Sequence, residues 1–128
     1  MNQQGTIMET LGIETIHLSA DRVVCTMPVD GRTRQPFGLL HGGASVVLAE
    51  TAASLGTFAN IDQEQEYAVG MEINANHLRS VADGQVTATA VPLHRGRTTM
   101  VWDIKITDDK DRLICVSRCT VAIRKKPS

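Results

Sequence analysis

The chain has 128 residues, of which 42% are hydrophobic, and these values predict a single domain over residues 1–128. Its 13 Lys and Arg residues balance 14 Asp and Glu residues, which argues against a general nucleic-acid binder because such proteins are usually basic. Aromatic residues make up only 3% of the chain, so the base-stacking surfaces of proteins that bind single-stranded nucleic acid are not expected either.

The sequence also bears on compartment and metal content. No apolar run approaches the roughly 20 residues of a membrane span, and no signal-peptide pattern opens the sequence. Cys25, Cys115 and Cys119 form no CxxC motif, and together with the four histidines they show no zinc-site spacing. We therefore expect reduced thiols, a cytoplasmic location and no metal site.

Alternating apolar residues predict six strands, over residues 13–18, 22–28, about 67–78, 85–93, 100–107 and 113–124. In the strand over 67–78, the side chains of Val69, Met71, Ile73 and Ala75 are expected to share one face. Pro92 indicates an edge strand or a bulge near the end of its strand, because proline cannot donate to a sheet ladder.

The segment from residue 43 to about 60 has a different pattern. Its apolar residues, plotted at 100° per residue, cover nearly the whole circumference, which predicts a buried helix. The expected fold is therefore α+β, with a curled antiparallel sheet of five to six strands around one long buried helix. Because one sheet covers only part of such a helix, a second subunit is expected to cover the rest.

Glu50 is the only acidic residue within the apolar part of that helix. A carboxylate there is costly unless it is paired, protonated or used in chemistry, and no basic residue lies one helical turn away. Ser54 is one turn further on and could share a water molecule with Glu50. These features favour a base or nucleophile over a carboxylate that merely points to solvent.

The start of the helix offers hydrogen-bond donors. His41, Gly42 and Gly43 precede the apolar stretch, and paired glycines let backbone N–H groups approach a ligand where the helix dipole favours negative charge. Gly42 and Glu50 are roughly 12 Å apart along the helix at 1.5 Å per residue. They cannot act on one carbon atom in one subunit, so either one is idle or the active site needs a dimer.

Three ordered motifs resemble hotdog-fold acyl-CoA thioesterases. They are QPFGLLHGGASVVLAE, which runs from Gln35 to Glu50, GMEINANH from Gly70, and PLHRGR from Pro92. The resemblance covers about residues 10–124. It is strongest to the subgroup that contains the dihydroxynaphthoyl-CoA thioesterase of menaquinone synthesis and the proofreading thioesterase of enterobactin synthesis.

The resemblance implies a role for each motif residue. Glu50 would act as nucleophile or as general base toward water, and the Gly42 N–H of the partner subunit would polarise the thioester carbonyl. Gln35 would assist that polarisation, His41 would position the thioester, and Ser54 would help hold the attacking water. The acyl and CoA pocket would be lined by Gly70, His77, Leu78, Arg79, Ser80, His94, Arg95, Gly96, Arg97, Thr98 and Thr99, with the three arginines as candidate phosphate partners.

The resemblance further implies a homotetramer built as a dimer of dimers, an acyl-CoA substrate, and a reaction without metal or organic cofactor. Two departures are visible. The helix-forming material that precedes the first strand in relatives is largely missing here, and the loop over residues 60–66 differs. The resemblance therefore does not fix the acyl group of the substrate. Aryl-CoA esters of the benzoyl or dihydroxynaphthoyl type are favoured, while medium-chain acyl groups and carrier-protein thioesters are alternative substrates.

Two alternatives lie within the same fold. A hydratase or dehydratase would pair a histidine with an acid around a β-hydroxyacyl group, whereas here His41 precedes Glu50 in the thioesterase order. An acyl-CoA-binding module without activity is the other alternative. Such regulators carry a DNA-binding domain, for which this chain has no room, and tend to lose the carboxylate that Glu50 supplies.

Overall fold

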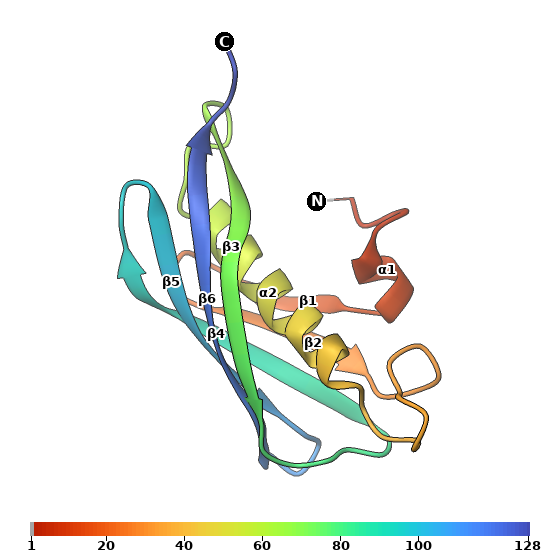
Figure 1. Cartoon of the computed structure of the whole chain (residues 1–128). Helices are drawn as coiled ribbons and strands as arrows, with labels where there is room; N and C mark the ends of the chain where they lie inside the picture. The colour runs from red at the N-terminus through yellow and green to blue at the C-terminus, as the bar shows by residue number, and fades with distance from the viewer. Residues whose placement is uncertain (1) are drawn as a thin grey trace.

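The computed structural model describes residues 2–128, which form two helices and six strands (Figure 1). In chain order the elements are α1 (Ile7–Leu11), β1 (Glu14–Leu18), β2 (Val23–Pro28), α2 (Gly42–Phe58), β3 (Glu66–His77), β4 (Gln85–Arg95), β5 (Thr99–Thr107) and β6 (Leu113–Lys125). The strands form one antiparallel sheet in the order β1-β2-β4-β5-β6-β3. The sheet curls around α2 (Figure 1), and α2 packs against β2, β3, β4, β5 and β6.

This architecture confirms the predicted fold, a curled antiparallel sheet around one long helix. Each predicted strand and the predicted helix is present, with ends within two residues of the expected positions. Pro92 lies at a register shift in β4 between Pro92 and His94. Because β4 is an interior strand, the proline marks a bulge rather than an edge. Within the described part of the chain, neither helix is long and apolar enough for a bilayer span.

The core fixes α2 against the sheet through small residues. The Gly56 backbone lies directly on the indole ring of Trp102, since a Cβ at residue 56 would be 2.3 Å from that ring. The buried Trp102 Nε1 donates to Thr57 Oγ1 at 2.9 Å, and this hydroxyl donates to the Ala53 carbonyl oxygen at 2.9 Å. These contacts set how α2 is rotated, and they leave Glu50 and Ser54 on its half-buried side.

Strand β3 contains a bulge that the sequence pattern did not predict. Its register against β6 shifts between Gly70 and Glu72, so Met71 is the extra residue. One extra residue reverses which side chains face the core. Ala68 before the bulge and Ile73 and Ala75 after it all pack against the core.

The prediction that Val69, Met71, Ile73 and Ala75 share one face is therefore wrong. Val69 and Met71 are 50% and 58% exposed, whereas Ile73 and Ala75 are partly buried against the core. Strict alternation fails here because the bulge changes the parity of the strand. Strand β3 is also an edge strand, paired with β6 on one side only.

A short helix precedes the first strand. Helix α1 has five residues and ends at Gly12, whose φ of 73° is the left-handed conformation that favours glycine. The expectation that helix-forming material is largely missing before the first strand is corrected by this element. Met8 and Leu11 pack against the core, so α1 is held to the rest of the domain by apolar contacts.

Candidate active site

Helix α2 begins with a histidine cap. The His41 backbone is extended, and its Nδ1 atom accepts a hydrogen bond from the Gly43 N–H at 2.8 Å. With Nδ1 as an acceptor, the neutral imidazole carries its proton on Nε2, which can donate to another group. The His41 carbonyl oxygen accepts from the Ala44 N–H at 3.0 Å. These bonds engage the N–H groups of Gly43 and Ala44 and leave that of Gly42 for an incoming oxygen atom.

Gly42 borders a cavity of about 330 Å³. The cavity is lined by Gln35, Leu39, Leu40, Gly42, Ser45, His77, Leu78, Arg79, Ser80 and Ile114. It therefore unites Gln35 and Gly42 with the predicted segment from His77 to Ser80. Contact at Gly42 is close, because a Cβ there would be 2.8 Å from His77 Nε2. The Gln35 Oε1 atom accepts from the Phe37 N–H, so the amide nitrogen of Gln35 is the end that can donate to a ligand.

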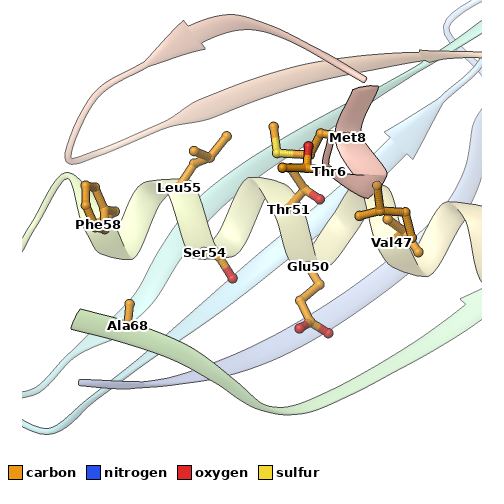
Figure 2. A pocket seen from close by; sticks show the side chains of 10 residues that line it. Thr6, Met8, Val47, Glu50, Thr51, Ser54, Leu55, Phe58 and Ala68 are labelled. Carbon is orange, nitrogen blue, oxygen red and sulfur yellow. The ribbon is translucent and has the colours of Figure 1, made fainter. Parts of the chain in front are cut away.

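Glu50 and Ser54 border a different cavity, of about 500 Å³. Figure 2 shows both side chains projecting from α2 toward β3. The remaining walls are mostly apolar and come from α1 with its N-cap, from α2 and from β3: Thr6, Ile7, Met8, Val47, Thr51, Leu55, Phe58 and Ala68. Among residues 2–128, no basic side chain forms an ion pair with Glu50. A half-buried, unpaired carboxylate in an apolar cavity is suited to act as a base or nucleophile.

The absence of a side chain at Gly70 makes room for the Glu50 carboxylate. The Glu50 Oε2 atom lies 2.4 Å from the position that a Cβ would take at residue 70. Any larger residue would displace the carboxylate. The two halves of β3 approach different residues of the site. Gly70, before the bulge at Met71, contacts Glu50, and His77, after the bulge, contacts Gly42.

The buried thiols are not nucleophiles. Burial raises the pKa of the Cys119 thiol to about 12, and the charges of Glu50 and Glu72 add to the effect. Burial likewise raises the pKa of the Cys25 and Cys115 thiols. All three cysteines are free and buried. The thiols are therefore protonated and unreactive near neutral pH.

The segment from His94 to Thr99 lies at the turn between β4 and β5, and it lines neither of the two cavities. The Gly96 N–H donates to the Thr99 carbonyl oxygen at 2.8 Å, which closes the turn. Arg95 forms an ion pair with Asp21 and donates to Asn60 Oδ1 at 3.3 Å. Arg97 and Thr98 are exposed in the turn.

Hydrophobic periodicity does not reveal the residues that α1 and its N-cap contribute to the Glu50 cavity, which are Thr6, Ile7 and Met8. A signal for this helix exists, because Thr6 and Glu9 have the spacing of a capping box and Gly12 is a typical helix end. Thr6 precedes the helix as expected from that spacing, although its side chain makes no capping hydrogen bond.

Comparisons with known proteins agree with this geometry. Residues 37–115 match the Thioesterase superfamily. The chain is 58% identical to ComA2 of Bacillus subtilis over 126 residues, covering 98% of this chain and 100% of that one. It is 51% identical to the 1,4-dihydroxy-2-naphthoyl-CoA hydrolase of Listeria monocytogenes over 120 residues, covering 94% of this chain and 97% of that one.

Solved structures of thioesterases have the same fold. A variant of thioesterase PA1618 from Pseudomonas aeruginosa superposes with a TM-score of 0.94 at 47% identity, covering 97% of this chain and 89% of that one. Thioesterase SAV0944 from Staphylococcus aureus, also solved as a variant, gives a TM-score of 0.90 at 51% identity, covering 92% and 98%. The resemblance seen in the sequence motifs is confirmed by these matches. The chain belongs to the Thioesterase superfamily and is a thioester hydrolase of the hotdog fold.

Proposed function

We propose that the chain hydrolyses aryl-CoA thioesters at a site formed between two copies, with Glu50 of one copy and Gly42 of the other acting on the same thioester. The observation that carries this proposal is that Glu50 and Gly42 border two different cavities of one chain. The two residues are also roughly 12 Å apart along α2. A donor and a carboxylate that act on one carbon atom must both lie within about 3–3.5 Å of it.

Exposed apolar side chains support the dimer. Phe37, beside Gln35 and before α2, is 89% exposed, which is unusual for a large aromatic side chain. The unpaired edge of β3 carries exposed Tyr67, Val69 and Met71. A long, exposed and apolar edge strand is a surface for pairing with another chain. Pairing of β3 with β3 of a second copy would bring the Glu50 cavity of one chain toward the Gly42 cavity of the other.

The chemistry assigned to this site is acyl transfer to water. The Gly42 N–H, the Gln35 amide and the Nε2–H of His41 would donate to the carbonyl oxygen, on which negative charge develops as the tetrahedral intermediate forms. Glu50 would either attack the carbonyl carbon to give an anhydride, which water then opens, or remove a proton from water held by Ser54. In both routes the C–S bond breaks, CoA leaves as the thiol, and water supplies the second oxygen of the carboxylic acid.

CoA recognition would rest on basic side chains near the Gly42 cavity and at the β4–β5 turn. Arg79 lines that cavity, and Arg97 is exposed in the turn. Both can donate to phosphate oxygens in the bidentate manner that arginine favours. Arg95 is the weaker candidate, because Asp21 and Asn60 already hold its guanidinium group. The tetramer and the cytoplasmic location remain predictions.

The relatives support an aryl-CoA substrate and the roles of Gln35 and Glu50. The Listeria relative is named for an aryl-CoA ester. SAV0944 was solved with one glutamate and, separately, with one glutamine replaced by alanine. Those two positions are separated in that chain by the same number of residues as Gln35 and Glu50 are here.

The first experiment measures thiol release from benzoyl-CoA by the wild type, by Glu50→Gln and by the control Glu64→Gln, which changes an exposed glutamate in the loop before β3. We expect Glu50→Gln to lower kcat by at least about 100-fold with little change in KM, because it removes the base or nucleophile but keeps the size of the side chain. Glu64→Gln should match the wild type. Equal activity of all three proteins would contradict the role of Glu50.

A mixing experiment tests the shared site. Gly42→Val should be inactive by itself, because a side chain at residue 42 would collide with His77. When Glu50→Gln and Gly42→Val chains are co-expressed, half of the dimers are mixed, and each mixed dimer has one intact composite site. We therefore expect about one quarter of the wild-type activity to return. No recovery from dimers shown to be mixed would place the whole site in one chain.

A further inference from the structure

A second cavity adjoins the one that contains Glu50. It has a volume of about 590 Å³ and lies between β1 and the C-terminal end of α2. Met8, Leu55 and Phe58 line both cavities, so these three side chains are the partition between them. The second cavity reaches Thr15 and Leu18 on β1 and Gln63 beyond α2.

Helix α2 gives the direction and the length of the combined space. Figure 2 shows Glu50 near the middle of the visible helix, Phe58 at its far end, and Met8 above Thr51 beside Leu55. From Glu50 to Phe58 the helix rises by about 12 Å. An acyl group that starts at the Glu50 carboxylate and follows the helix therefore reaches the partition, and a longer one would continue toward Leu18.

The partition is made of movable parts. Met8 is half buried on the five-residue helix α1, and methionine is the side chain that adapts most easily to a change in its surroundings. A rotation of its flexible side chain would widen the opening between the two cavities while Leu55 and Phe58 stay in place on α2. Leu18 on the far side is 49% exposed, so the second cavity opens toward solvent along the edge strand β1.

We propose that the two cavities form one elongated acyl site, in which Met8, Leu55 and Phe58 separate a proximal part beside Glu50 from a distal part that reaches Leu18. The proximal part takes an aromatic ring or the first methylene groups of the substrate, and the distal part takes the end of a linear, uncharged acyl chain. This inference rests on the proposed thioester hydrolysis at Glu50 and extends its substrate class from aryl to linear acyl thioesters. Glu14, which also lines the distal part, disfavours a negatively charged chain end.

The test compares kcat/KM for benzoyl-, hexanoyl-, decanoyl- and hexadecanoyl-CoA. For the wild type we expect kcat/KM to rise from hexanoyl- to decanoyl-CoA by up to about fourfold for each methylene group that is buried. Leu18→Trp, which fills the distal part, should lower the decanoyl-to-benzoyl ratio of kcat/KM at least about tenfold, because it excludes several methylene groups. The matched control is Ile16→Trp, on the same strand, 61% exposed and lining neither cavity, which should keep the wild-type ratio.

Met8→Ala tests the partition itself. It removes the one side chain of the partition that does not come from α2 and should raise the decanoyl-to-benzoyl ratio above that of the wild type. Because Met8 also packs against the core, the thermal unfolding of this variant is measured in parallel. Leu18 is partly exposed, so Leu18→Trp is expected to fold. Its result therefore tests the elongated site even if Met8→Ala does not fold.

A binding measurement separates this inference from the proposed function. Calorimetric titration of Glu50→Gln with hexanoyl- and decanoyl-CoA reports affinity without turnover, and we expect decanoyl-CoA to bind more tightly, with the difference abolished by adding Leu18→Trp. Equal ratios for Leu18→Trp and Ile16→Trp, together with affinity independent of chain length, would overturn the elongated site even if benzoyl-CoA is hydrolysed. Chain-length-dependent binding without hydrolysis of any ester would support the elongated site and overturn the hydrolytic role of Glu50.

Discussion

The Glu50 carboxylate lies directly against the backbone of Gly70, with Oε2 2.4 Å from the position that a Cβ would take there. The absence of a side chain at residue 70 therefore leaves space for the carboxylate. Glu50 comes from α2 and Gly70 from β3, so this contact also ties the proposed catalytic group to the edge strand that we expect to meet a second subunit.

Gly70→Ala should impair catalysis more than folding. The added methyl group meets the end of a flexible side chain, so the carboxylate moves while the backbone stays in place. A displacement of about 1 Å can cost about 100-fold in rate, so we expect kcat for benzoyl-CoA to fall by about 10- to 100-fold with a smaller change in KM. The control is Gly31→Ala, where a Cβ would meet nothing within 4 Å. An equal kcat for the two variants, both of wild-type size by gel filtration, would contradict this role of Gly70.

Two neighbouring arginines should respond differently to removal. Arg97→Ala should raise KM for an acyl-CoA with little effect on kcat, because it removes an exposed candidate partner of a CoA phosphate. Arg95→Ala should affect thermal stability rather than KM, because that guanidinium group already binds Asp21 and Asn60. Steady-state kinetics and a melting curve on both variants check this, and an unchanged KM in Arg97→Ala removes the assignment.

The buried bond between Trp102 and Thr57 should matter for stability. Thr57→Val keeps the shape of the side chain but leaves the Trp102 Nε1–H without its acceptor at 2.9 Å. An unsatisfied buried donor costs about 1–3 kcal/mol, so the free energy of unfolding in urea should fall by that amount. Thr89→Val, a half-buried position on β4, serves as the comparison and should change stability by less than about 0.5 kcal/mol.

Acid should destabilise the turn at Asp30 and Arg32, which precedes α2 in the chain. Hydrogen bonds from the Arg32 side chain and backbone lower the pKa of Asp30 from 3.8 to about 2. A carboxyl group whose pKa is lower in the folded state stabilises the fold above its unfolded pKa, and this contribution is lost as the pH falls through the folded value. The free energy of unfolding should therefore decrease as the pH falls from about 4 to about 2.

Asp30→Asn should flatten that pH dependence, because it removes the titrating group. Urea unfolding at several pH values between about 4 and 2 measures the slope. Asp83→Asn is the matched control, since the Asp83 side chain is exposed and forms no ion pair within residues 2–128. The same slope in Asp30→Asn and in the wild type would show that the ion pair with Arg32 does not contribute.

Much of the fold follows from local pattern. The strands and α2 begin and end within two residues of the positions that hydrophobic periodicity predicts. Helix α1 was missed because five residues contain too little periodicity to stand out, although Thr6, Glu9 and Gly12 mark its ends. The bulge at Met71 was missed because strict alternation continues through it in the sequence, whereas the extra residue reverses the face of the strand.

The candidate site was predictable in parts. The motif residues Gln35, Gly42 and Glu50 and the distance along one helix were enough to predict that the donor and the carboxylate cannot meet within one chain. The grouping of Gln35 with His77, and of Glu50 with Gly70, was not predictable from spacing. It depends on the curl of the sheet and on the bulge in β3.

The sequence by itself determined which segments are helix and strand, that the long helix is buried, and which residues carry the thioesterase motifs, because periodicity and motif order are local properties of the chain. The tertiary structure decided which side of β3 faces α2, that Glu50 and Gly42 border separate cavities, and that Met8 stands between the Glu50 cavity and a second one. These features arise from contacts between residues far apart in the chain. The extra residue at Met71 changes the face of β3 and the missing side chain at Gly70 makes room for Glu50, and hydrophobic periodicity does not record such effects.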